Sequence, residues 1–420
     1  KSNSFCTLLA DHSGAMAAAE QPPAAATLEA DNSRARVAWL GAKTAADLDS
    51  VEKELRRILD ATKRGTKLTG DPKYRAVRDS ARQRLCLLLI QAGRGGEADA
   101  ILRKAGCVAR LSDSVLAYAA PEDAANVNDD NAQERVPGVV VDGLLSDSVM
   151  RCLDANFLSQ EAPYWTAHGY AVEPPTPYFS YAVPIDAVRG KPGALGALGA
   201  VIRAALRSLK LYRGADVEAR ATVAELWAHN RPHPSGHQFH FDSDDEGRGG
   251  VRNPIASCVA YLTTGVGGPT VITNQRLADT ELARDGWVAH PRRGRLVMFN
   301  GDVLHGVVPG RGVGPTTAAD GVSAPRRVTV MVALWEELRI RDDPGFGSSR
   351  PLPSPEGPDA PEWVRILCGP QPEGTQEAAD DSELHVVEPA HVKPVWSDLD
   401  GQPWPEGKRM PPYEKAFQGF

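Results

Sequence analysis

The feature that most constrains the fold is a change of hydrophobic period partway along the 420-residue chain. Between residues 219 and 338, short β-branched or aromatic runs alternate with Gly and Pro breaks. These runs are residues 221–227, 255–262, 270–273, 294–299, 304–308 and 328–335. Several short strands at such spacing are typical of an all-β sandwich or barrel.

The preceding region has helical spacing instead. Apolar residues recur on one helical face over residues 48–59. Asp71 followed by Pro72 is typical of an N-cap and a first helical residue. A third helix is expected over about 97–104. Residues 45–120 are therefore predicted to be an α-helical hairpin region, a helical annex whose expected role is packing or partner binding.

Three more segments complete the predicted organisation. Residues 1–44, rich in Ala and Ser, are interpreted as a weakly ordered arm, and the polar residues 121–136 as a linker. The barrel would occupy 137–341, with supporting helices that include one at about 193–211. Residues 342–420 are Pro-rich and predicted to wrap the surface as an extended tail. Grooves would hold its large aromatic rings, which are Trp363, Trp396, Trp404 and Tyr413.

Composition limits the classes of function. The formal charge of −7 lacks the basic excess of a nucleic-acid or membrane-surface binder. No apolar run is long enough to span a membrane. Six scattered cysteines without a C-x-x-C pair argue against a disulfide scaffold or a cysteine zinc site, and favour an intracellular, reducing compartment. Residues 1–30 lack the pattern of a secretory signal, although Lys1 is also compatible with a processed leader.

The stretch before residue 243 contains the first part of a candidate metal site. Residues i and i+2 of a strand point to the same face, so His240 and Asp242 present an imidazole and a carboxylate side by side. His305 lies in a second strand-like run. Two histidines and one carboxylate form the facial set that leaves positions open on non-haem Fe(II). Each piece alone arises often by chance, and a lone strand histidine is usually an ordinary core or surface residue.

A third element lies at the start of the last strand. Arg327 and Thr329 share one face there. The planar guanidinium of an arginine binds a carboxylate through two hydrogen bonds, and a threonine adds a hydroxyl. Such a pair suits a dicarboxylate co-substrate deep in a barrel.

With these pieces in order, the sequence resembles the Fe(II)/2-oxoglutarate-dependent dioxygenases, and in detail the prolyl 4-hydroxylase-like branch, over roughly residues 137–338. The matching parts are residues 139–146, the triplet His240-Phe241-Asp242, and residues 260–262, 267–270, 291–299, 304–307 and 327–335. The resemblance implies an α+β fold built on a double-stranded β-helix, or jelly-roll, barrel. It also implies hydroxylation of a C–H bond in a peptide (prolyl or other) or a small molecule, with succinate and CO2 as co-products.

The resemblance also implies roles for individual residues. The implied Fe(II) ligands are His240, Asp242 and His305. Arg327 would bind the distal carboxylate of 2-oxoglutarate with help from Thr329, and Tyr261 would hydrogen-bond the same co-substrate. Dioxygen is the second co-substrate, and ascorbate is an optional reductant.

Two departures from the family pattern bear on these roles. Arg327 lies 22 positions after His305, a longer gap than usual, and residues 310–325 are expected to form an inserted loop. The gap raises Arg326 as an alternative, but strand alternation with Thr329 favours Arg327. The collagen-type prolyl hydroxylases have a lysine at this position, so the substrate does not follow by analogy.

Other polar residues near the triplet have weaker interpretations. Trp227, Asn230 and Gln238 are candidates for the substrate pocket, although a tryptophan in a β-run is more often core. Histidines recur every four residues at 229, 233 and 237, but prolines at 232 and 234 prevent a helix, which favours a loop of surface histidines. A solvated face is the expected role of two charged clusters. These are Asp244, Asp245 and Glu246, and Arg284, Arg292, Arg293 and Arg295.

Two other hypotheses compete with an oxygenase. The barrel could be kept as a structural subunit, with the N-terminal helices and the Trp-bearing tail binding protein partners. A cupin-like barrel with another metal and no 2-oxoglutarate is disfavoured, because Arg327 would then have no purpose.

Overall fold

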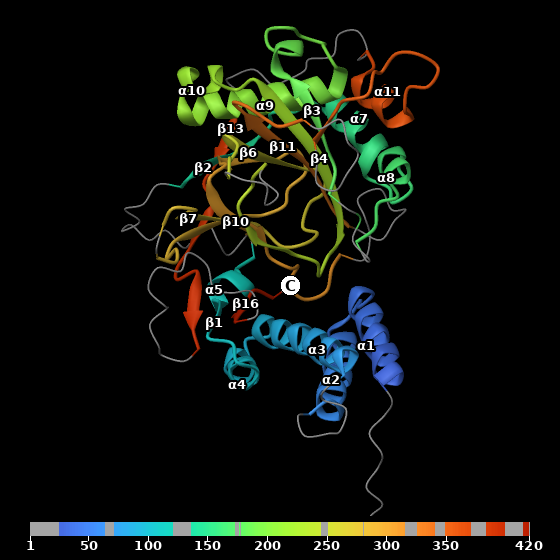
Figure 1. Cartoon of the computed structure of the whole chain (residues 1–420), viewed down its shortest axis with the longest axis vertical. Helices are drawn as coiled ribbons and strands as arrows, with labels where there is room; N and C mark the ends of the chain where they lie inside the picture. The colour runs from blue at the N-terminus through green and yellow to red at the C-terminus, as the bar shows by residue number, and fades with distance from the viewer. Residues whose placement is uncertain are drawn as a thin grey trace, which may run out of the picture.

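A computed structural model describes residues 25–63, 71–120, 136–172, 176, 178–244, 251–279, 281–315, 326–340, 349–370, 384–399 and 415–419. Figure 1 shows a barrel between two helical regions. The N-terminal helices lie below it, and the helices α7 to α11 lie above and beside it. No helix among the described residues is both long and apolar enough to cross a membrane.

The N-terminal annex consists of five described helices. They are α1 (Ala25–Leu40), α2 (Ala45–Ala61), α3 (Pro72–Gln91), α4 (Gly95–Ala105) and α5 (Asp113–Leu116). Capping residues begin both α2 and α3, and the cap of α3 was predicted from the sequence. The Thr44 hydroxyl accepts a hydrogen bond from the Asp47 backbone N–H at the start of α2, and Asp71 caps α3 with Pro72 as its first residue. The predicted helical region is therefore present.

The expectation of a weakly ordered arm over residues 1–44 is wrong for α1. This helix packs against α2 and α3. Its buried positions are Leu28, Asp31, Asn32 and Ala35, a helical stripe in which two of the four residues are polar. Arg57 pairs with Asp31, and Arg84 donates to Asn32 Oδ1 at 2.8 Å. Because the stripe depends on partners from other helices, hydrophobic period alone did not reveal it.

Two antiparallel sheets form the barrel. The larger sheet has the order β12-β3-β4-β11-β6-β9-β2-β13, and only β12 runs parallel to its neighbour. Its strands are β2 (Gly138–Asp142), β3 (Ser180–Pro184), β4 (Val223–Pro232), β6 (Ala256–Tyr261), β9 (Leu296–Asn300), β11 (Arg326–Trp335), β12 (Ser349–Pro351) and β13 (His385–Val387). The smaller sheet has the order β14-β8-β7-β10-β5. Its strands are β5 (His237–His240), β7 (Thr270–Arg276), β8 (Gly286–Ala289), β10 (Val303–Val307) and β14 (Ala390–Val392).

The strand order is that of a jelly roll. The eight strands from β4 to β11 are shared equally between the sheets, with β4-β11-β6-β9 in one and β5-β10-β7-β8 in the other. The predicted barrel is therefore confirmed. An inner apolar cluster that includes Trp227, Tyr261 and Phe299 fills the space between the sheets.

Helices cover the outer face of the larger sheet. They are α7 (Asp147–Phe157), α8 (Pro163–His168), the 3-10 turn η1 (Ile185–Ala187), α9 (Gly196–Arg213), α10 (Ala215–Ala219) and α11 (Glu362–Cys368). The expected amphipathic helix is α9, and its apolar face joins Val330 and Leu334 of β11 in one core. Alternate residues of β11 therefore face this outer core and the barrel interior.

The annex and the barrel also share a core. Phe239, Val271 and Leu304 of the smaller sheet belong to the same buried cluster as Leu87 and Leu116 of the annex. The Gln91 side chain donates to the Pro309 carbonyl oxygen at 3.3 Å across this boundary. The annex is therefore packed on the outside of the smaller sheet and is not a separate domain without contacts to the barrel. Residues 121–135 lie outside the described residues.

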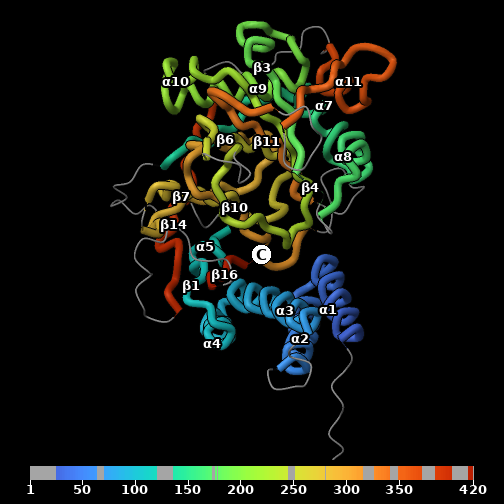
Figure 2. Tube along the Cα trace, viewed as in Figure 1, coloured from blue at the N-terminus to red at the C-terminus, as the bar shows by residue number. Residues whose placement is uncertain are grey.

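The described parts of the tail are integrated into the fold. A small sheet joins β15 (Trp396–Asp398) and β16 (Ala416–Phe417) to β1 (Ala109–Leu111) of the annex, and Figure 2 shows β16 beside β1. Trp363 and Trp396 are buried, as expected, but Trp363 lies in helix α11 rather than in an extended segment. Trp404 and Tyr413 lie outside the described residues. None of the five described cysteines forms a disulfide.

Candidate metal centre

Three predicted ligands come together inside the barrel. His240 ends β5 and is directly opposite His305 of β10 in the strand register, and Asp242 follows two residues after His240. Asp242 Oδ1 lies 3.4 Å from His240 Nε2, and its Oδ2 lies 3.7 Å from His305 Nε2. The ligand atoms of all three lie within 4.8 Å of one another. Among the described residues, no other group of three or more His, Cys, Asp or Glu side chains is this close together.

Neighbouring groups fix the orientation of each ligand. Nδ1 of His240 bonds to the Gln238 carbonyl oxygen at 2.7 Å, and Nδ1 of His305 bonds to the Val303 carbonyl oxygen at 3.1 Å. Both Nε2 atoms are thereby directed at the centre, as is usual for metal-binding histidines. The Ser257 hydroxyl donates to Asp242 Oδ2 at 2.5 Å.

The protonation states of Asp242 and His305 suit metal binding. Burial opposes ionisation of Asp242, but His305 and His240 hold the pKa of that carboxyl well below its usual range. Burial lowers the pKa of His305 to about 4, so its imidazole is neutral near pH 7. An anionic carboxylate beside imidazole nitrogens is a donor set that fits Fe(II).

A second polar group of residues lies on neighbouring inner positions of the larger sheet. Arg327 and Thr329 of β11 are 2% and 0% exposed, and Thr329 is directly opposite Tyr261 of β6. Arg327 Nη2 donates to the Thr270 hydroxyl at 3.1 Å, and its guanidinium carbon lies 5.1 Å from the centre of the Tyr261 ring. The Tyr261 hydroxyl lies 2.5 Å from the Thr270 hydroxyl. The three predicted co-substrate residues are thus neighbours.

Two buried atoms of this group have no hydrogen-bond partner within the described part of the chain. They are Arg327 Nε and Thr329 Oγ1. A buried polar atom without a partner costs about 1–3 kcal/mol, so this pair fits a site that is completed by a ligand carboxylate. Gly267 leaves room for the arginine, because a Cβ there would lie 2.5 Å from Arg327 Cδ.

The choice of Arg327 over Arg326 agrees with strand alternation. Arg326 points to the opposite face of β11, where its Nε donates to Asn230 Oδ1 at 2.5 Å. That contact also corrects the prediction that Asn230 lines the substrate pocket. On β4, Asn230 faces away from the side that carries Trp227 and His229.

The other two pocket candidates have different positions. Trp227 is 8% exposed and belongs to the inner apolar cluster, which agrees with its alternative role as core. Gln238 is exposed and lines a cavity next to His240.

The expectation of a loop of surface histidines is wrong for His229 and His237, whereas His233 lies in the turn between their strands. His229 and His237 lie on β4 and β5 with their ring centres 5.4 Å apart, and His237 stacks on His240 at 4.6 Å. Burial holds the pKa of both well below the usual range. The four-residue spacing fits a helical face, but the prolines exclude a helix, and the sequence therefore favoured a loop. The useful signal was the alternation of Trp227, His229 and Arg231 on one face of a strand, which we missed.

The charged clusters agree only in part with the expectation of a solvated face. Arg293 forms an ion pair with Asp154, and Arg292 and Arg295 both pair with Asp142. Asp244 pairs with Arg252, whereas Asp245 and Glu246 lie outside the described residues. Arg292 and Arg293 are exposed, as expected of a solvated face, whereas Arg295 and Asp244 are largely buried in their ion pairs.

Comparison with known proteins gives matches among solved structures alone. No protein-family model and no curated protein matches the sequence. A Pseudomonas putida prolyl-4-hydroxylase is 20% identical, with a TM-score of 0.30, over 51% of this chain and 99% of its own. HygX from Streptomyces hygroscopicus, solved with nickel and 2-oxoglutarate, is 13% identical with a TM-score of 0.27, over 51% of this chain and 90% of its own.

The non-haem α-ketoglutarate-dependent carbocyclase SnoK from nogalamycin biosynthesis is 11% identical with a TM-score of 0.30, over 55% of this chain and 95% of its own. At such identities and scores, function is better judged from the site than from the neighbours.

Proposed function

We propose that this chain is an Fe(II)- and 2-oxoglutarate-dependent dioxygenase that hydroxylates a C–H bond of a peptide or small-molecule substrate. The observation that carries the proposal is the joint presence of two sets of residues in one barrel. One is the facial set of His240, Asp242 and His305, and the other is the buried Arg327 with Thr329. A cupin-like metal site without 2-oxoglutarate would not need the second set.

Each set would have a separate task. The two histidines and Asp242 would hold Fe(II) and leave positions open, while Arg327 and Thr329 would bind and orient the distal carboxylate of 2-oxoglutarate. Bound Fe(II), with 2-oxoglutarate and O2 as co-substrates, would supply the oxidising power, with succinate and CO2 as co-products. The apolar neighbours Trp227 and Phe299 would help to exclude water.

The test is metal binding together with succinate formation. Purified protein with Fe(II), 2-oxoglutarate and ascorbate should bind the metal and release succinate, slowly without a substrate and faster with one. His240→Ala should lower both the metal affinity and the succinate rate by at least about a hundredfold, because it removes a ligand whose supporting contacts alone are typically worth 10–100-fold. His385→Ala, at an exposed position of β13, is the matched control.

Protein that binds neither Fe(II) nor 2-oxoglutarate would contradict the proposal. That result would favour the other candidate, a barrel retained as a structural or interaction subunit.

A further inference from the structure

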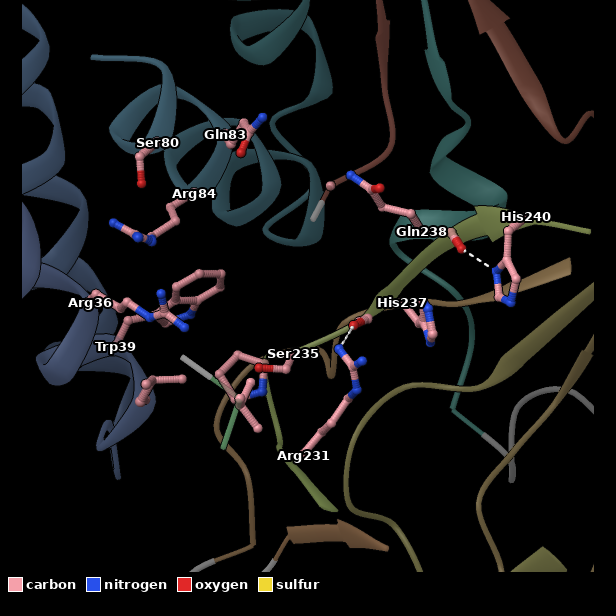
Figure 3. Close-up of a pocket in the computed structure, with 15 residues that line it drawn as sticks. Arg36, Trp39, Ser80, Gln83, Arg84, Arg231, Ser235, His237, Gln238 and His240 are labelled. Atoms are coloured by element: carbon pink, nitrogen blue, oxygen red, sulfur yellow. Dashed lines mark hydrogen bonds between the residues drawn. The ribbon is translucent and has the colours of Figure 1, made fainter. Parts of the chain in front are cut away.

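A cavity of about 670 Å³ separates the annex from the mouth of the barrel. Arg231, His237, Gln238 and His240 line it from the barrel, so it reaches a predicted metal ligand. From the annex it is lined by Arg36, Trp39 and Leu40 of α1 and by Ser80, Gln83 and Arg84 of α3. Figure 3 shows the two groups facing each other across the opening. The volume is typical of small-molecule sites.

Three arginines from three different elements converge on this cavity. They are Arg36 on α1, Arg84 on α3 and Arg231 on β4. No Asp or Glu is present among the described residues that line the cavity. The polar lining is therefore cationic, although the chain as a whole has a charge of −7.

The contacts of two of these arginines leave their charge uncompensated. Arg84 donates to the neutral amide of Asn32, and Arg231 donates from Nη1 to the Gly236 carbonyl oxygen at 2.9 Å. Among the described residues neither has an acidic partner within ion-pair distance, and Arg231 Nε is buried without a hydrogen-bond partner. Burial, with repulsion from Arg36, lowers the pKa of Arg84 to about 10, so it stays charged near pH 7.

Holding like charges together in a partly buried space is unfavourable unless a counter-charge is present. A carboxylate or phosphate group meets this need, because each can accept paired hydrogen bonds from a guanidinium. A group bound in the cavity would have Arg36 and Arg84 of the annex on one side and Arg231 of β4 on the other.

We propose that the substrate is a small molecule with a carboxylate or phosphate group, and that Arg36, Arg84 and Arg231 bind this group beside the metal centre. The inference rests on the function proposed above and deepens it. It gives the annex a role as one wall of the substrate site. Arg84 and Arg231 are then residues that determine substrate specificity.

Binding of matched probe pairs tests this proposal without turnover. The intact chain would be titrated by ligand-observed NMR with glycerol 3-phosphate against glycerol, and with N-acetylglutamate amide against N-acetylglutamine amide. Each titration would be run with no metal, and again with Zn(II) and saturating 2-oxoglutarate. The anionic member of at least one pair should bind about tenfold more tightly than its neutral partner. The pair that responds distinguishes phosphate from carboxylate.

Variants locate the effect. Arg84→Gln and Arg231→Gln should each weaken binding of the anion about tenfold, as expected for loss of a charged hydrogen-bond donor. Arg84→Lys should retain most of it. Arg75→Gln, at an exposed arginine of the same helix α3, should have no effect. Unchanged affinity of each variant for Zn(II) would show that the fold and the metal centre are intact.

Three results would overturn the proposal. The first is equal binding of the charged and neutral probes. The second is an equal loss of anion affinity in Arg75→Gln and Arg84→Gln. The third is binding of an acidic nonapeptide by a protein that binds neither small anion. Because no step here requires oxidation, anion binding without succinate formation would refute the proposed function alone. Succinate formation without preference for an anion would refute the inference alone.

Discussion

Arginines on the surface of the annex and in the barrel interior differ in their partners. On the annex surface, Arg56 and Arg94 form ion pairs with Glu52 and Glu97 at 2.6–2.9 Å, and most of these side chains are well exposed. In the barrel, Arg327 is buried and one of its nitrogen atoms has no partner among the described residues. Exposed pairs contribute about 0–1 kcal/mol each, whereas an unpaired buried group is costly. The difference teaches that these exposed ion pairs of the annex are structural, whereas the unpaired atoms of Arg327 and Thr329 fit a site that a ligand completes.

The largest effect is expected at the boundary between the two regions, where a substitution tests whether they share one core. Phe239 is fully buried in the cluster that the annex and the smaller sheet share. Phe239→Ala should lower the free energy of unfolding by about 3–5 kcal/mol, because it leaves a cavity in this joint core. Chemical denaturation followed by circular dichroism would measure it, with Val386→Ala at an exposed position as control. Two separate unfolding transitions, with the barrel transition unchanged, would show that the regions are independent domains.

The next effect concerns the co-substrate. Arg327→Ala should weaken binding of 2-oxoglutarate by about 10–100-fold, since a hydrogen bond to a charged group is worth roughly 1.5–3 kcal/mol. Calorimetric titration of Mn(II)-loaded protein would measure the dissociation constant. Arg326→Ala, on the outer face of the same strand, should bind 2-oxoglutarate normally. A larger loss of 2-oxoglutarate affinity in Arg326→Ala than in Arg327→Ala would show that Arg326 binds the co-substrate.

A smaller effect is expected from the group that orients Asp242. Ser257→Ala removes the hydroxyl that donates to Asp242 Oδ2, and should lower metal affinity about tenfold, at the weaker end of the range for such contacts. Competition with a chelator would measure the affinity. Ser208→Ala is a suitable control, because Ser208 is also buried but bonds to Ala204 on α9. Equal metal affinity in both variants would show that the Ser257 hydroxyl does not contribute to metal binding.

The smallest effect should come from the annex surface. Hydrogen bonds from Arg94 and Arg56 lower the pKa of Glu97 to about 2 from its ordinary 4.5. A lowered folded-state pKa stabilises the fold above about pH 4.5, and this contribution disappears as the pH falls toward 2. Glu97→Gln should therefore lower the Tm slightly at pH 7 and hardly at all at pH 2. Glu29→Gln, at an exposed position on α1, is the control. A Tm difference that grows in acid would contradict this sign.

Strand alternation explains both the successes and the failures of prediction at the site. It placed His240 with Asp242 and Arg327 with Thr329, because residues two apart in a strand share a face. Applied consistently to β4, the same rule would have separated Asn230 from Trp227 and placed His229 and Arg231 on the inner side. Nothing local to Ser257 indicates that its hydroxyl reaches Asp242, because that contact depends on the packing of two strands.

The sequence by itself determined the local elements and the identity of the chemical groups. Helical spacing, the Asp71 cap and the period-two runs specify helices and strands through neighbours in the chain, and the histidines, Asp242 and Arg327 carry their chemistry wherever they lie. Only the tertiary structure decided which groups meet. The buried stripe of α1 is partly polar and depends on Arg57 and Arg84, so no pattern within residues 25–40 indicates that it packs. Long-range packing alone places Arg36 and Arg84 opposite Arg231 beside the candidate metal centre, because these residues are far apart in sequence and meet only when the annex packs on the smaller sheet.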